Sequence, residues 1–67
     1  MKLDYQLTLA VAISATVNEF DEIPSGMIYG SLMATGLTLE EYQNIIQLLI
    51  RKGEIRQSGN ILYARES

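Results

Sequence analysis

A capped helix that runs directly into a short hairpin is the feature that most constrains the fold of this chain. Thr38 and Glu41 have the spacing of a capping box, in which each side chain accepts a hydrogen bond from the other residue's backbone amide. They predict a helix from Thr38 to Lys52, and Gly53 fits the left-handed position that ends such a helix. A short hairpin is predicted next, with one strand over residues 54–57, a turn over residues 58–60 and a second strand over residues 61–64.

The length and composition of the chain limit what else it can be. Sixty-seven residues make one domain, over residues 1–67, and such a domain buries only about 60% of the surface that its unfolded chain exposes. The sequence has no cysteine and no histidine, so it lacks disulfides, thiolate ligands and the commonest general base. We therefore expect no catalytic residues, no metal site and no cofactor, and we do not expect an enzyme.

The first helix is predicted from Asp4 to Phe20, and it is apolar on two sides. One face at helical spacing comprises Leu9, Ile13, Val17 and Phe20. Well away from that face lie Leu7, Val11 and Ala15. An apolar surface this wide needs more than one neighbour to cover it. The second neighbour is either another copy of this helix in a homodimer, with Leu7, Val11 and Ala15 as the interface, or the remaining helices of the same chain.

The second helix follows an acidic connector over residues 18–23. It is predicted to run from Pro24 or Ser25 to Ala34, since proline suits a first helical turn and serine suits a cap. Gly36 then fits the left-handed residue of the turn that follows. The inner face of this helix is expected to comprise Met27, Ile28 and Leu32, extended by Met33, with Tyr29 near its edge.

Two glycines lie on one side of the second helix, at positions Gly26 and Gly30. Each costs about 1 kcal/mol relative to alanine inside a helix. That cost predicts that another backbone, from the first or the third helix, approaches closely at both positions.

The third helix is strongly amphipathic. Its buried face is expected to comprise Leu39, Tyr42, Ile45, Ile46, Leu49 and Ile50, and its polar face Glu40, Gln43, Asn44, Gln47 and Arg51. In the hairpin, Ile55 is expected to point inward and Arg56 outward. The register of the second strand stays open, because either Leu62 or the pair Ile61 and Tyr63 could face the core.

No segment predicts a membrane span or a targeting signal. The longest uncharged stretch covers residues 5–18, which is shorter than the roughly 20 apolar residues that a spanning helix needs. The start of the chain carries one base and no cleavage pattern for a signal peptide. We therefore expect a cytoplasmic protein without membrane contact.

The predicted order of helix, helix, glycine turn, helix and hairpin resembles the winged helix-turn-helix superfamily, a mainly α fold with a small two-stranded β-hairpin as its wing. Residues 23–33, 39–42 and the hairpin after Gly53 are also similar to small stand-alone bacterial winged-helix proteins without an assigned role. The resemblance implies that residues 38–52 form a recognition helix for the major groove of duplex DNA.

The same resemblance implies which residues would contact the DNA. The base-facing candidates are Gln43, Asn44 and Gln47, since side-chain amides can bond two groups of adenine at once. The phosphate-contacting candidates are Arg51, Lys52 and Arg56, with Lys2 or Arg65 as further contacts.

The charge of the chain points away from generic DNA binding. Residues 1–50 carry one base and six acids, a net charge of −5, whereas residues 51–67 carry four bases and two acids, a net charge of +2. The sequence pI of 4.6 is far below the value above about 9 that is typical of DNA-binding domains. Two functions are therefore predicted: a DNA-binding transcriptional regulator that acts as a dimer through residues 38–52, or an acidic winged-helix module for protein–protein interaction.

Overall fold

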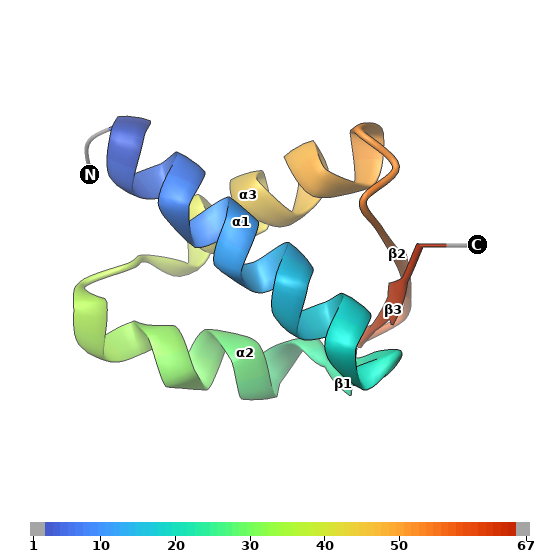
Figure 1. Ribbon diagram of the computed structural model, residues 1–67. Coiled ribbons are helices and arrows are strands. Elements are labelled where there is room, and N and C mark those ends of the chain that lie inside the picture. Colours follow the sequence, from blue (N-terminus) through green and yellow to red (C-terminus); the bar gives the residue numbers. More distant parts are fainter. Residues whose placement is uncertain (1–2, 66–67) are drawn as a thin grey trace.

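The computed structural model describes residues 3–65 of the chain. The helices of this part are α1 (Leu3–Phe20), α2 (Ser25–Leu32) and α3 (Leu39–Arg51), with a short 3₁₀ helix, η1 (Met33–Thr35), directly after α2. Its strands are β1 (Glu22–Pro24), β2 (Ile55–Ser58) and β3 (Ile61–Ala64). In Figure 1, α1 crosses between α2 and α3, and the sheet lies at the end where α1 finishes. The predicted mainly helical class, with three α-helices before a hairpin, is therefore confirmed.

The sheet of the described chain has three strands, so the prediction of a two-stranded wing is wrong. β1 pairs antiparallel with β3, which places Ile23 opposite Leu62, and β2 pairs with the other edge of β3. The strand order is therefore β1-β3-β2. A strand of three residues carries almost no periodic pattern, and its proline argues against a strand, so the sequence indicates only a connector here. Pro24 is tolerated because β1 is an edge strand, whose outer side needs no hydrogen bond to a neighbour.

The corner between α1 and β1 is fixed by two polar residues. Asp21 adopts a left-handed φ of 67°, and its carbonyl accepts a 2.7 Å hydrogen bond from the amide of Ala64. The side chain of Asn18 donates to the carbonyl of Glu54 at 3.1 Å and accepts from the amide of Arg65 at 3.2 Å. These bonds join the end of α1 to both ends of the hairpin.

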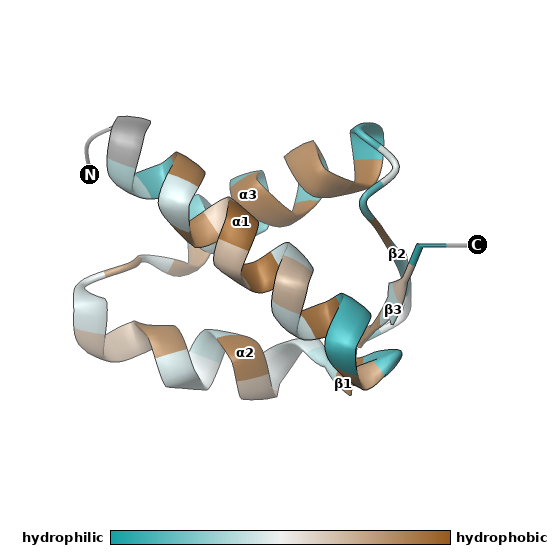
Figure 2. Ribbon diagram, viewed as in Figure 1, coloured by the Kyte–Doolittle hydropathy of each residue, from teal (hydrophilic) through white to brown (hydrophobic). Residues whose placement is uncertain are grey.

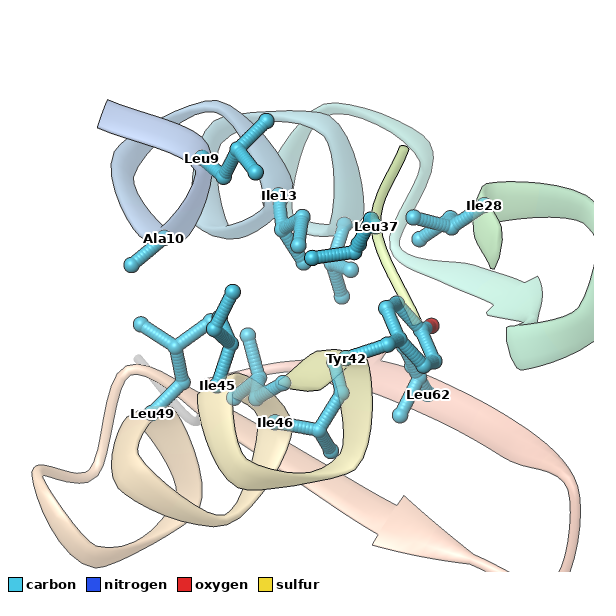
Figure 3. Packing of buried hydrophobic residues seen from close by; sticks show 12 residues of the cluster. Leu9, Ala10, Ile13, Ile28, Leu37, Tyr42, Ile45, Ile46, Leu49 and Leu62 are labelled. Carbon is cyan, nitrogen blue, oxygen red and sulfur yellow. The ribbon is translucent and has the colours of Figure 1, made fainter. Parts of the chain in front are cut away.

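The hydrophobic core lies between α1, α3 and the inner face of the sheet. Figure 3 shows Ala10 and Ile13 of α1 turned toward Ile45 and Leu49 of α3. Figure 2 shows hydrophobic residues along both helices and hydrophilic residues at their C-terminal ends. The buried side chains are Leu9, Ala10, Ile13, Val17, Ile28, Leu37, Tyr42, Ile45, Ile46, Leu49, Ile55 and Leu62.

Leu62 settles the register of the second hairpin strand. Its side chain is 0% exposed, whereas Ile61 and Tyr63 are half-buried. Ile55 is buried and Arg56 is exposed, which confirms the predicted orientation of the first hairpin strand. The sheet therefore contributes two large side chains to the core.

Four residues that we expected on inner faces are exposed instead, with exposed fractions of 51–62%. They are Phe20, Met27, Met33 and Leu39. Each lies at or near the end of a helix, where the chain leaves the helical period: Phe20 ends α1, Leu39 begins α3, and Met33 begins the 3₁₀ helix. Periodicity predicts a face correctly only while neighbouring elements cover the helix along its whole length.

The expected close approach at the two glycines of α2 is also wrong. A Cβ atom built on Gly26 or Gly30 would meet nothing within 4 Å outside its own stretch of helix. We therefore expect Gly30→Ala to raise the free energy of unfolding by about 0.5–1 kcal/mol, because alanine is the better helix former. Urea unfolding measures the gain. A loss of stability would mean that α2 is packed against a partner at this position.

The capping box of α3 is confirmed. The amide of Thr38 donates to Oε1 of Glu41 at 3.0 Å, and the amide of Glu41 donates to Oγ1 of Thr38 at 3.1 Å. The residues that turn the chain before and after the helix, Gly36 and Gly53, have φ angles of 87° and 75°, as predicted. Local sequence therefore marks both the start and the end of α3.

We expect Thr38→Ala to lower the free energy of unfolding by about 1 kcal/mol, because the Glu41 amide loses its acceptor. Urea unfolding at neutral pH measures the loss. Thr35→Ala is the matched control, since its hydroxyl bonds the carbonyl of Leu32 at an exposed site away from the start of α3. If both variants lost the same stability, the capping box would have no special role.

The capping box also predicts a dependence on pH. Hydrogen bonds from the backbone and the side chain of Thr38 hold the pKa of Glu41 below its ordinary value of 4.5. A carboxyl whose pKa is lowered by folding stabilises the protein above the unfolded pKa, and this contribution is lost as the pH falls through the folded pKa. The stability advantage of the wild type over Glu41→Gln should therefore be constant at neutral pH and should shrink below pH 4.5. Urea unfolding over this pH range tests it, with Glu40→Gln as the control.

Candidate nucleic-acid interface

The side-chain amides of α3 lie along a groove with a volume of about 720 Å³. The predicted base-facing residues Gln43, Asn44 and Gln47 are all exposed, and all three line this groove. Two further amides, Gln57 and Asn60, reach it from the hairpin. These two residues were not predicted as site residues, although their place at the hairpin turn directly after α3 was a usable signal. The groove thus gathers five carboxamides.

Hydrogen bonds hold the walls of the groove at a fixed separation. The amide of Ser25, at the start of α2, donates to the carbonyl of Asn60 in the hairpin turn at 2.8 Å. The hydroxyl of Tyr42, on α3, donates to the carbonyl of Ser25 at 3.1 Å and lies 2.8 Å from its Oγ. Because the tyrosine proton is used on the carbonyl, Oγ of Ser25 donates to the tyrosine oxygen.

The aromatic side of the groove strengthens this junction. The rings of Tyr29 and Tyr42 lie 5.1 Å apart at an angle of 43°. Burial raises the pKa of Tyr42, so its hydroxyl stays protonated as a donor at neutral pH. The start of α2, the first turn of α3 and the hairpin turn are therefore joined by hydrogen bonds into one frame around the groove.

Four of the five carboxamides make no hydrogen bond within the described part of the protein. Gln57 donates from Nε2 to the carbonyl of Gly59 at 3.1 Å. The side chains of Gln43, Asn44, Gln47 and Asn60 make no hydrogen bond to any described residue. Each carboxamide offers two N–H donors and one carbonyl acceptor, so the groove presents donors and acceptors to a ligand.

The predicted basic contacts are not gathered with the amides. Arg56 donates from Nε to the carbonyl of Ala64 at 3.2 Å, and its guanidinium lies 5.7 Å from the ring centre of Tyr63. Arg65 lies 3.9 Å from Glu54, with both side chains largely exposed. Arg51 is exposed in the last turn of α3. Among the described residues that line the groove, none is charged.

Lys52 lies on a different surface, together with the outer face of α1. A hollow of about 560 Å³ is lined by the predicted dimer residues Leu7, Val11 and Ala15, and by Lys52. Leu7 is 50% exposed and Val11 is 71% exposed. The alternative that the other helices of the same chain cover this face is therefore wrong. We call the surface formed by Leu7, Val11 and Ala15 the α1 patch.

The two glutamates at the start of α3 differ in their surroundings. The carboxylate of Glu41 is held in the capping box, which directs it toward the backbone of Thr38. Glu40 is exposed in the same turn. A phosphate that approached the start of α3 would therefore meet one outward carboxylate rather than two.

Comparison with protein-family models, curated proteins and solved structures finds no match to this chain. Within residues 3–65, no helix combines the length and the apolar character that crossing a membrane requires. In the same part of the chain, no group of three or more acidic side chains is placed to hold a metal ion. The groove and the α1 patch are therefore the two surfaces that bear on function.

Proposed function

We propose that this protein is a small winged helix-turn-helix protein that binds duplex DNA as a dimer and regulates transcription, with α3 as its recognition helix. Support comes from the element order, in which α2 and α3 are joined by a short glycine turn and are followed directly by the β2–β3 hairpin. In helix-turn-helix proteins, the N-terminal residues of the recognition helix contact base edges in the major groove. Gln43 and Asn44 lie in the second turn of α3, and Gln47 lies one turn further along the helix.

The observation that carries the proposal is that Gln43, Asn44 and Gln47 are exposed, share one groove and have no partner among the described residues. Unused carboxamides on a surface helix gain little for stability, because water already satisfies them. They are the side chains that recognise adenine by paired hydrogen bonds. Arg51 is exposed in the last turn of α3, one turn after Gln47, and in this proposal it contacts a phosphate beside the groove.

The dimer is the second part of the proposal, and the α1 patch supports it. Monomeric proteins rarely expose a wide apolar surface without a use for it. A two-fold dimer through α1 would cover Leu7 and Val11 and would present two copies of α3, as palindromic DNA sites require.

Charge favours a second candidate, a protein–protein interaction module. The groove contains no basic side chain among its described residues, and the chain has a net charge of −3. Phosphate neutralisation supplies most non-specific DNA affinity, and here Arg56 and Arg65 already make contacts within the fold. A neutral groove of donors and acceptors would equally suit the backbone of an extended peptide.

DNA binding is tested by titrating the labelled protein with a mixed-sequence duplex and following the amide NMR shifts. A salt concentration of about 50 mM is used because electrostatic binding is strong at low salt. We expect shifts at Gln43, Asn44, Gln47 and Arg51 that fade as salt is added. The backbone amides of α1 and α2 that lie away from the groove serve as the internal control and should not shift. Absence of shifts at protein and duplex concentrations near 1 mM, far above typical non-specific dissociation constants, would reject DNA binding and favour the protein module.

A further inference from the structure

The chemistry of the groove goes beyond a general contact with DNA. Its five carboxamides come from two separate elements, α3 and the hairpin, and they surround a space that has no charged side chain among its described lining residues. A surface built to hold phosphates would show arginine or lysine there. The donors and acceptors of this groove therefore fit a neutral ligand surface that itself alternates donors and acceptors.

We infer that the groove reads adenine in A·T base pairs, through Gln43, Asn44 and Gln47 of α3 with Gln57 and Asn60 of the hairpin; this inference rests on the proposed function. Adenine presents an acceptor, N7, beside a donor, N6, in the major groove, which matches the donor and acceptor of one carboxamide. Guanine presents two acceptors, N7 and O6, which call for arginine or lysine. The groove offers no such side chain among its described residues.

The groove is held in shape before any ligand binds. Ser25 joins the hairpin turn through its amide and joins α3 through the Tyr42 hydroxyl, with distances of 2.8–3.1 Å. Base reading needs donors at fixed positions, because a misplaced amide cannot make both hydrogen bonds. The frame around Ser25 supplies this fixed separation between the two sets of amides.

Few basic side chains are available for phosphate contacts, so contacts to the nucleobases should dominate the affinity. If Arg51 and one further basic side chain contact phosphates, about two phosphates are neutralised per protomer. The slope of log K against log salt is then about −2 per protomer. Binding to random sequence should then be weak, and discrimination between sequences should be large. This combination distinguishes the proposed reader from a generic basic DNA-binding protein.

Selection from a duplex library with a randomised centre is the test. We expect enrichment of duplexes with adenines in both half-sites. Replacing those adenines with 7-deazaadenine, which lacks the N7 acceptor but still pairs with thymine, should weaken binding by about 5- to 150-fold per contacted base. Enriched duplexes without adenines, or binding insensitive to 7-deazaadenine, would overturn the inference and leave DNA binding intact. Retention of duplexes without enrichment of any sequence would overturn the inference alone. If no duplex were retained at low salt, both would be overturned, and a random peptide library screened in parallel would then show whether the groove binds peptide.

A matched pair of variants assigns the reading to the groove. Gln43→Ala/Gln47→Ala should abolish the preference for the enriched duplex over its 7-deazaadenine form, while the fold is retained, because both side chains are exposed and alanine favours helix. Gln6→Ala removes an amide from α1, outside the groove, and should leave the preference unchanged. Equal effects of the two variants would overturn the assignment.

Discussion

Leu62→Ala should lower the free energy of unfolding by about 2–5 kcal/mol, the largest loss that we expect from a single side-chain truncation in this protein. Leu62 lies in the central strand of the sheet, is 0% exposed and has Ile23 as its neighbour on β1. The truncation removes the transfer free energy of a leucine side chain and leaves a cavity under α1. A domain of this length has a total stability of about 3–10 kcal/mol, so the variant should lose a large fraction of its stability.

Leu39→Ala is the control for this variant, because it makes the same chemical change at a side chain that is 51% exposed. We expect it to cost less than about 1 kcal/mol. Urea unfolding of both variants at one protein concentration measures the difference, with the concentration fixed because a dimer would make stability depend on it. Similar losses would show that Leu62 does not face the core, and the register of β3 would then be wrong.

The bounds and the inner face of α3 are the features that the sequence predicts well. The capping box and Gly53 define α3 because their geometry is local, and the prediction of these bounds depends on a few adjacent residues. The inner face of α3 is also predicted, apart from its first residue, because the polar and apolar positions repeat over three turns. Leu39 is misplaced because α2 covers the first turn only on the side of Tyr42, and the side chain of Leu39 is left 51% exposed.

Strand β1 and the frame around Ser25 could not be predicted, since both depend on contacts between distant parts of the chain. Nothing local marks Glu22–Pro24 as a strand, and it forms because β3 offers an open edge beside it. The same reason explains the candidate site. The three amides of α3 follow from helical spacing, whereas the addition of Gln57 and Asn60 depends on how the hairpin folds back toward α2.

The sequence gives the number and order of the basic residues but not the surfaces on which their side chains lie. The sequence places four basic residues in the last 17 residues, at the end of the third helix and on the hairpin. In the structure, Lys52 lines the same hollow as the α1 patch, and Nη1 of Arg65 lies 3.9 Å from Oε2 of Glu54. Side chains that are adjacent in sequence at the end of a helix point to different surfaces, because successive residues are rotated by about 100°.

Val11→Glu should weaken the proposed dimer by about 100-fold or more. Val11 is the most exposed large hydrophobic side chain of α1, and it lies near the middle of the α1 patch. In a two-fold dimer, a residue near the axis faces its own copy, so the substitution brings two carboxylates together in an apolar interface. Juxtaposed like charges cost several kcal/mol, and each 1.4 kcal/mol corresponds to about a tenfold change in the dissociation constant.

Sedimentation equilibrium of the wild type and the variant measures this effect. Ala34→Glu is the matched control, because it adds the same charge at an exposed residue of η1, away from α1. Both variants should keep their fold, since glutamate forms helix at least as well as valine and both sites face solvent in the single chain. A wild type that stays monomeric at millimolar concentration would remove the dimer from the proposal. A dimer that withstands Val11→Glu would use a surface other than the α1 patch, and the two copies of α3 would then need a different spacing on DNA.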